Sequence, residues 1–200
     1  MKKFKIDNFK HYLSTGVGVA LAQLVSFLSV PFIAKLAGVN VFGQYNYLLA
    51  LLGVVGVFTS LRLEYSIYNL SQELYFFLDK VFASITIVLS ILLSFFVFLV
   101  PNADSHYGLV YISSVITLFS IANFEFNIQN NIKLGAFKLN AFSRVLRALI
   151  FPVIFYIFYL TTQINEFLIL FAFAFANLIP VLLFKAKKDV NSSYPISYLS

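Results

Sequence analysis

Long apolar stretches alternate with short polar connections along the whole chain. A helix that crosses the hydrocarbon core of a bilayer needs roughly 20 mostly apolar residues. Stretches of about this length recur along the sequence, so the pattern predicts an all-α, polytopic membrane helix bundle with about six transmembrane helices. The predicted spans are Leu13–Ala34, Gln44–Leu61, Val81–Val100, Leu109–Ile128, Val145–Leu160 and Phe167–Phe184, and we expect the short fifth span to begin earlier, near Asn140.

The basic residues lie in alternate connections of this pattern. All but one of the 14 Lys and Arg residues fall in the N-terminal segment, the second and fourth connections and the C-terminal tail. Lys35 is the exception. Because cytoplasmic loops retain Lys and Arg, both ends of the chain are predicted to lie on the cytoplasmic side (N-in/C-in). Models with five or seven spans would scatter these charges over both sides.

The sequence also allows predictions for the two ends of the chain. A Lys-rich start before an apolar run is also typical of a secretory signal peptide. The run is long, however, and Pro31–Lys35 offers no small-x-small cleavage site, so we expect an uncleaved first helix. Residues 1–188 are therefore expected to form a six-helix transmembrane lobe, and residues 189–200 a polar tail or linker stump.

Composition supports a membrane protein and excludes several kinds of chemistry. The chain is 60% hydrophobic and 11% charged. Soluble domains are about half apolar and about a quarter charged. Cysteine is absent, which excludes disulfides, thiolate metal sites and Cys nucleophiles. The net charge of +6 could suggest a nucleic-acid partner. The charged residues lie between the apolar stretches, which is typical of the connections of a membrane protein. No nucleic-acid binding is therefore expected.

No enzyme signature appears in the sequence. It lacks the H-E-x-x-H, G-x-S-x-G and phosphate-loop motifs, and both histidines fall in extramembrane segments. We therefore expect a protein that is not an enzyme and that carries no catalytic residue, metal or cofactor. All four aspartates are predicted to lie outside the spans: Asp7, Asp79, Asp104 and Asp189.

Two polar features mark the first two predicted helices. Gln23 follows the small residues Gly16 and Gly18, so it can either hydrogen-bond across a tight helix contact or serve only in packing. Arg62 and Glu64 lie two positions apart, which on a helix predicts that they do not pair. Each then needs another partner or water, although Arg62 could also be an interfacial anchor.

The fourth predicted span is the most polar one. Asn123 and Asn127 lie on or beside a polar face, and Glu125 lies about a third of the helix away from it. A carboxylate at membrane depth is costly unless it meets a cation or a water-filled cavity, so a cavity-facing role is one interpretation. If the helix ends at Phe124, Glu125 is instead an ordinary loop residue.

Arg144 and Arg147 share a helical face because they are three residues apart. Since a guanidinium presents a fork of donors that matches phosphate oxygens, the two could clamp a diphosphate. Retention of positive charge on the inner surface also explains the four cations between residues 133 and 147.

Several of these segments together resemble a known family, the Wzx-type polysaccharide (O-antigen) repeat-unit flippases of the multidrug/oligosaccharidyl-lipid/polysaccharide exporter superfamily. The resemblance spans roughly residues 13–188 and is strongest in the first 70. The segments that carry it are Gln23, Pro31–Leu36, Phe42–Tyr45, Arg62–Ile67, Gly135–Lys138 and Ser143–Leu146.

The resemblance implies a function as well as a fold. It implies export of undecaprenyl-diphosphate-linked oligosaccharides across the bacterial inner membrane, for surface polysaccharide such as the O-antigen of lipopolysaccharide. By the same analogy, Arg62, Glu64 and the polar residues of the fourth span are cavity candidates, and the basic inner segments meet the diphosphate. The substrate-binding candidates are Gln23, Arg62, Glu64, Asn123, Glu125, Asn127, Arg144 and Arg147. The implied partners are the lipid-linked oligosaccharide and membrane lipids.

One departure from the family is plain: such flippases have two related lobes, and this chain has the length of one. A substrate held between two halves has no enclosed site in one half alone. A truncated product is the first explanation, and a homodimer or a separate second lobe are the others. Other classes stay open: a small-molecule exporter of the same superfamily, an accessory or structural subunit without transport activity, and an enzyme of lipid-linked sugar assembly, which lacks the residues it would need.

Overall fold

The computed structural model describes the backbone of residues 2–99 and 107–184, and the side chains of residues 15–71, 73–96 and 108–184. This part of the chain contains helices and no strand. The predicted polar tail, Asp104, Asp189 and His106 lie outside the described residues. The elements are α1 (Lys2–Ala37), α2 (Val39–Thr59), α3 (Leu63–Ser66), α4 (Gln72–Leu93), the 3-10 helix η1 (Ser94–Leu99), α5 (Tyr107–Lys133), α6 (Phe137–Thr161) and α7 (Glu166–Leu183).

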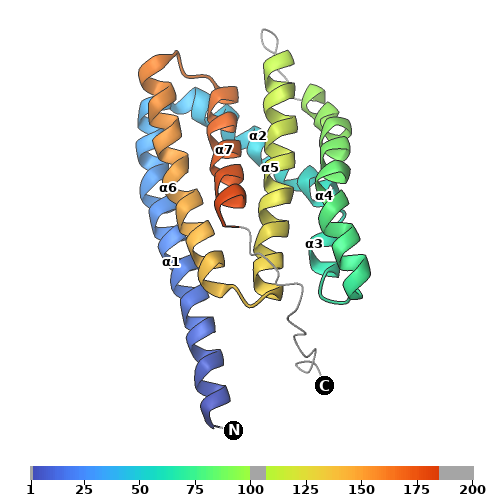
Figure 1. Ribbon diagram of the computed structural model, residues 1–200. Helices are drawn as coiled ribbons and strands as arrows, with labels where there is room; N and C mark the ends of the chain where they lie inside the picture. The colour runs from blue at the N-terminus through green and yellow to red at the C-terminus, as the bar shows by residue number, and fades with distance from the viewer. Residues whose placement is uncertain (1, 100–106, 185–200) are drawn as a thin grey trace.

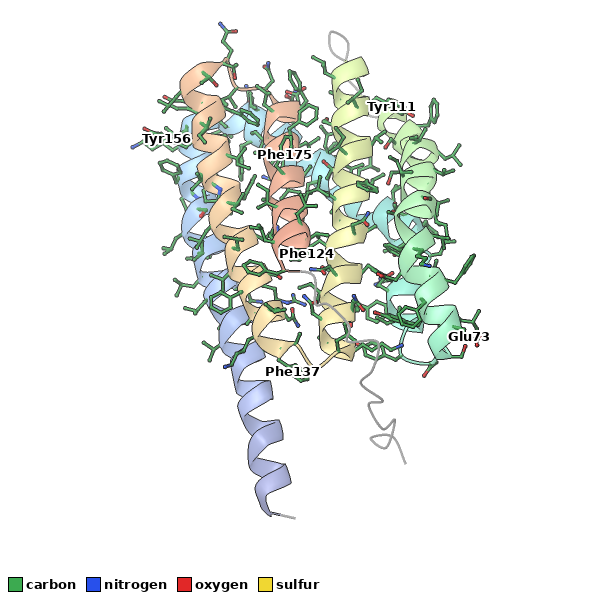
Figure 2. The ribbon with its side chains drawn as sticks, in the orientation of Figure 1. Glu73, Tyr111, Phe124, Phe137, Tyr156 and Phe175 are labelled. Carbon is green, nitrogen blue, oxygen red and sulfur yellow. The ribbon has the colours of Figure 1, made fainter. Side chains whose placement is uncertain are left out.

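Six of the described helices are long and apolar enough to cross a membrane, which confirms the predicted all-α, six-span bundle. Tyr156 and Phe175 lie on the outside of the bundle (Figure 2), and each is more than two-fifths exposed. Apolar surface of this extent requires lipid to cover it. The chain is therefore a multi-pass membrane protein.

The helices form one curved layer with a single helix behind it. Figure 1 shows α1 beside α6, then α7, α5 and α4 in turn, while α2 crosses obliquely behind α7 and α5. The beginning of α1 and the end of α7 lie toward the same end of the bundle. Among the described elements, α5 contacts the most others, and α1 packs against α6 and α2 alone.

The interior of the bundle is polar along α5, as the sequence predicts for this span. Asn177 of α7 donates to Ser120 Oγ at 3.4 Å, and Thr117 of α5 donates to the carbonyl oxygen of Leu170 at 3.4 Å. Since lipid tails are as apolar as leucine, such hydrogen bonds and close packing hold membrane helices together. The fully or almost fully buried polar residues of α5 are Ser113, Ser114, Thr117, Ser120, Asn127, Asn130 and Asn131.

Two of the predicted span boundaries were wrong in ways that matter for function. The third span begins at Glu73 rather than at Val81, so Asp79 lies inside it, contrary to the prediction that all aspartates are outside. The helix α5 continues to Lys133, so Glu125 is not a loop residue. The fifth span begins at Phe137, which confirms the expectation of an earlier start near Asn140 and places Arg144 and Arg147 within a span rather than at its inner surface.

The prediction that Arg62 and Glu64 do not pair was also wrong. The helix α2 ends at Thr59, and both Leu61 and Arg62 adopt the left-handed region, with φ of 50° and 56°. The chain therefore turns between the two charges, and Arg62 Nη1 lies 4.0 Å from Glu64 Oε1. The Arg62 side chain is 57% exposed, so this pair contributes little to stability.

The contact between α1 and α6 depends on a glycine. A Cβ atom at Gly18 would lie 2.8 Å from the Cα atom of Ala141, closer than real Cβ atoms approach backbone. Gly16 has open space around it instead. The predicted tight contact at these small residues is thus confirmed at Gly18 and not at Gly16.

We expect Gly18→Ala to lower the free energy of unfolding by about 1–2 kcal/mol, because an overpacked contact must move apart along α1 and α6. Titration with a denaturing detergent, followed by circular dichroism, measures the change. Gly16→Ala is the matched control, since a methyl group there meets nothing within 4 Å. Equal losses at Gly16 and Gly18 would contradict the packing explanation.

The orientation of the bundle in the membrane stays a prediction, and the absence of cysteine makes it simple to test. Ser71, before α4, and Gln163, between α6 and α7, are both exposed and lie at opposite ends of the bundle. If both termini are cytoplasmic, an impermeant maleimide should label Gln163→Cys in intact cells and Ser71→Cys only after lysis. The reverse pattern would show that the bundle is inverted.

Candidate functional site

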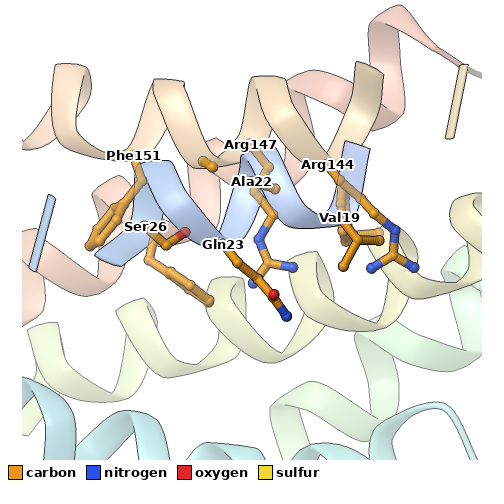
Figure 3. Close-up of a pocket in the computed structure, with 10 residues that line it drawn as sticks. Val19, Ala22, Gln23, Ser26, Arg144, Arg147 and Phe151 are labelled. Carbon is orange, nitrogen blue, oxygen red and sulfur yellow. The ribbon is translucent and has the colours of Figure 1, made fainter. Parts of the chain in front are cut away.

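A cleft of about 310 Å³ opens between α1, α5, α6 and α7. Figure 3 shows its walls, with α1 and α6 supplying most of the lining side chains. Its lining residues are Val19, Ala22, Gln23 and Ser26 of α1, Phe124 of α5, Arg144, Arg147, Ala148 and Phe151 of α6, and Phe173 of α7.

The two main walls share one helical pattern. The lining residues of α1 and those of α6 each follow the spacing i, i+3, i+4, i+7, so each helix presents a single face to the cleft. On α1 this face places the amide of Gln23 and the hydroxyl of Ser26 in the cleft, and both residues are exposed there. On α6 it places two guanidinium groups and one phenyl ring there.

The position of the arginines along α6 sets their depth in the bilayer. Arg147 lies ten residues after Phe137, the first residue of the span, or about 15 Å along the helix at 1.5 Å per residue. The whole span of 25 residues is about 37 Å long, so Arg147 lies about two-fifths of the way along it. A charge at that depth is costly, and it is retained where it faces a partner or a water-filled cavity.

Aromatic rings hold the Arg147 guanidinium on two sides. Its central carbon lies 4.7 Å from the ring centroid of Phe124 and 5.1 Å from that of Phe173. The ring of Phe173 in turn meets Phe151 edge to face, with centroids 5.7 Å apart. These contacts fix the plane of the guanidinium without using any of its N–H donors.

Arg144 is positioned by a hydrogen bond from its own helix. Its Nε donates to Asn140 Oδ1 at 3.2 Å, and Asn140 is fully buried. This bond uses the Nε–H donor of the guanidinium and leaves its other N–H donors to the cleft that Arg144 lines. The hydrogen bond to Asn140 therefore fixes the orientation of the Arg144 guanidinium in the cleft.

The charge of the cleft is positive. Its ten lining residues include two arginines and no carboxylate. Glu125 attracts Arg147 electrostatically and Arg144 repels it, but no ion pair within 4.0 Å joins Arg147 to Glu125. Arg147 also makes no hydrogen bond with any described residue, so its donors are available to a ligand.

Such a site is suited to an anion with oxygens on several sides. Guanidinium groups bind phosphate through two parallel N–H···O bonds, and a pair of arginines one turn apart can engage two adjacent phosphate groups. The amide of Gln23 and the hydroxyl of Ser26 add neutral donors and acceptors from the neighbouring helix α1. The cleft can therefore take a phosphate group together with a neighbouring polar group.

The eight predicted site residues do not all lie in one place in the structure. Gln23, Arg144 and Arg147 meet in this cleft. Asn123 and Asn127 line a second, separate cavity between α4, α5 and α7. The remaining three, Arg62, Glu64 and Glu125, line neither of these two cavities.

Sequence reasoning missed the aromatic residues of the cleft. Phe151 could have been found, because it follows Arg144 by seven residues and Arg147 by four and so shares their face. Phe124 and Phe173 could not, because they come from α5 and α7, distant in the sequence. Only packing brings them to Arg147.

The described residues contain no group of three or more His, Cys, Asp or Glu side chains that could hold a metal ion. Comparisons with known proteins add no family or neighbour: no protein-family model, no curated protein and no solved structure matches the chain. The function must therefore be argued from the cleft itself and from the sequence resemblance.

Proposed function

We propose that this chain is a six-helix lobe of a Wzx-type flippase, which moves undecaprenyl-diphosphate-linked oligosaccharide repeat units across the bacterial inner membrane for surface polysaccharide such as O-antigen. The observation that carries the proposal is the pair of arginines in a cleft at membrane depth. Arg147 lies about two-fifths of the way along its span with its donors available, and Arg144 lies one turn nearer the cytoplasmic end in the N-in orientation.

The chemistry of the cleft fits the head of such a lipid. A diphosphate carries negative charge on adjacent groups, which suits two guanidiniums three residues apart. The first sugar would extend toward Gln23 and Ser26 on the neighbouring helix α1. The polyprenyl tail would remain in the surrounding lipid, where the apolar outer face of α1 lies.

A lobe of this kind needs a facing surface to enclose its substrate. We propose that a second lobe, supplied by a second copy of the chain or by a separate polypeptide, covers the cleft on its open side. The mass of the assembly in lipid nanodiscs at low protein density distinguishes a homodimer from a monomer that awaits a different lobe.

Binding of a lipid series by the full chain in nanodiscs tests the proposal. We expect undecaprenyl diphosphate to bind at least about tenfold more tightly than undecaprenyl monophosphate, because a second phosphate adds charge-assisted hydrogen bonds. Uncharged undecaprenol should not bind specifically. The double variant Arg144→Gln/Arg147→Gln should lose the preference, and Lys35→Gln, an exposed cation outside the cleft, should keep it.

The alternative functions predict different results. An accessory or structural subunit should bind all three lipids equally, with or without the arginines. A small-molecule exporter should bind amphiphilic compounds in a way that added undecaprenyl diphosphate does not displace. Either result would overturn the proposed substrate.

A further inference from the structure

Glu125 is a charged residue beside the arginine cleft that the proposed function does not use. It follows Phe124 on α5, and the ring of Phe124 lies 4.7 Å from the central carbon of the Arg147 guanidinium. Consecutive side chains of a helix point about 100° apart, so Glu125 lies next to the wall of the cleft rather than in it. Its side chain is partly exposed.

Glu125 and the two arginines lie at similar depths in the bundle. The helices α5 and α6 run along the bundle side by side in sequence (Figure 1), and the connection between them spans residues 134–136 alone. Glu125 lies eight residues before Lys133, the end of α5, or about 12 Å along that helix. Arg144 and Arg147 lie seven and ten residues after the start of α6, or about 10.5 and 15 Å along it. The acidic residue is therefore level with the arginine pair.

Contacts among the described residues do not neutralise these three charges. Glu125 and Arg147 make no hydrogen bond and no ion pair there, and Arg144 donates only to the neutral amide of Asn140. Of the carboxylate and guanidinium groups that act on Arg147, Glu125 has the largest effect and attracts it, whereas Arg144 repels it. A charge at membrane depth is retained where it meets a counter-charge or a cavity. Glu125 therefore supplies counter-charge to the cleft at longer range than an ion pair.

A lipid diphosphate would bring a second source of negative charge to the same arginines. Two guanidinium groups and one carboxylate leave the empty site positive. A diphosphate carries enough negative charge to neutralise both arginines by itself, and it would repel a carboxylate at this depth, where water screens charges weakly. Glu125 and the ligand are thus each attracted to the arginines and repelled by each other.

We propose that Glu125 competes with the diphosphate of the ligand for the arginine pair, and so sets how readily the cleft releases that ligand. In the empty cleft the carboxylate faces Arg147; when the diphosphate binds, the Glu125 side chain, which no described contact holds, turns away. A transport site has to release its ligand as well as bind it. The inference rests on the proposed function, because it takes a lipid diphosphate as the ligand.

Binding of undecaprenyl diphosphate by the full chain in nanodiscs tests the competition. Glu125→Gln removes the charge at nearly constant size, and we expect it to bind this lipid about tenfold more tightly, mainly through slower dissociation. The gain should be smaller for undecaprenyl monophosphate, about threefold, because the repulsion scales with the charge of the ligand. Glu125→Asp keeps the charge and should bind like the wild type.

Glu166→Gln is the matched control. Glu166 is also partly exposed, and it begins α7 at the other end of the bundle. This variant changes the net charge by the same amount, so its affinity should stay within about twofold of the wild type if the position of the charge matters.

The stability of the empty chain tests the contact between Glu125 and Arg147 without any ligand. Glu125→Gln should raise the equilibrium constant of unfolding about fivefold, because Arg147 loses its counter-charge. In the Arg147→Gln background, the same change should have an effect of less than about twofold. Denaturing-detergent titration followed by circular dichroism measures all four chains.

The outcomes separate this inference from the proposed function. A wild-type chain that does not prefer the diphosphate lipid overturns the proposed function, whatever Glu125→Gln does. A wild-type chain that prefers it, with no tighter binding in Glu125→Gln or an equal gain in Glu166→Gln, overturns the competition alone. Equal effects of Glu125→Gln on stability with and without Arg147 would likewise show that Glu125 is not the counter-charge of this arginine.

Discussion

Replacing Arg147 by glutamine is expected to weaken the binding of undecaprenyl diphosphate about 100-fold, or by about 2.7 kcal/mol. The expectation follows from depth and orientation. The guanidinium lies about two-fifths of the way along its span, is held between the rings of Phe124 and Phe173, and makes no hydrogen bond with any described residue. A ligand phosphate would therefore meet a donor set that is already ordered and only partly hydrated.

Related variants separate charge from geometry. Arg147→Lys keeps the charge but loses the fork of donors, so we expect a loss of about tenfold. Arg144→Gln should also cost about tenfold, because Arg144 lies nearer the mouth and one of its donors is committed to Asn140. Dissociation constants from native mass spectrometry or from a fluorescent lipid in nanodiscs provide the measurement.

The control is Lys35→Gln, which removes an exposed positive charge outside the cleft. Its affinity should stay within about twofold of the wild type, because exposed charges interact weakly with a distant ligand. If Lys35→Gln and Arg147→Gln lose the same affinity, binding reflects general attraction of the anionic lipid to a basic protein, and the cleft is not the site.

The six spans could be predicted from sequence because hydropathy over 20 residues is a strong signal in a membrane protein. The start of α4 could not. Glu73, Asp79 and Lys80 lower the hydropathy of its first turns, although these turns are helical and lie within the span. That error hid Asp79, an acid that lies within the third span.

The arginine pair was predictable and its surroundings were not. The spacing of Arg144 and Arg147 identifies one helical face, and this face lines the cleft. The division of the other candidates between two cavities depends on how α5 is rotated against α4 and α7, which no local pattern encodes. The turn at Leu61 and Arg62 was equally hidden, because neither residue is a glycine, the usual residue in the left-handed region.

Replacing Arg147 by methionine is expected to stabilise the fold although it removes a binding residue: we expect the free energy of unfolding to rise, by less than about 4 kcal/mol. The guanidinium loses much of its hydration at this depth and has no carboxylate within ion-pair distance. Methionine fills a similar volume and keeps contact with the rings of Phe124 and Phe173 through its sulfur. The two lost cation–π contacts oppose this gain, at about 0.5–2 kcal/mol each.

Denaturing-detergent titration followed by circular dichroism measures this change, with Lys35→Met as the control that removes an exposed charge. A loss of stability in Arg147→Met would mean that the cation–π contacts outweigh desolvation, so that Arg147 is a structural residue and its effect on binding is indirect. A gain in stability together with the loss of diphosphate binding is the combination that distinguishes a functional residue from a structural one. This combination is expected if Arg147 destabilises the folded chain and is retained at membrane depth because it binds the ligand.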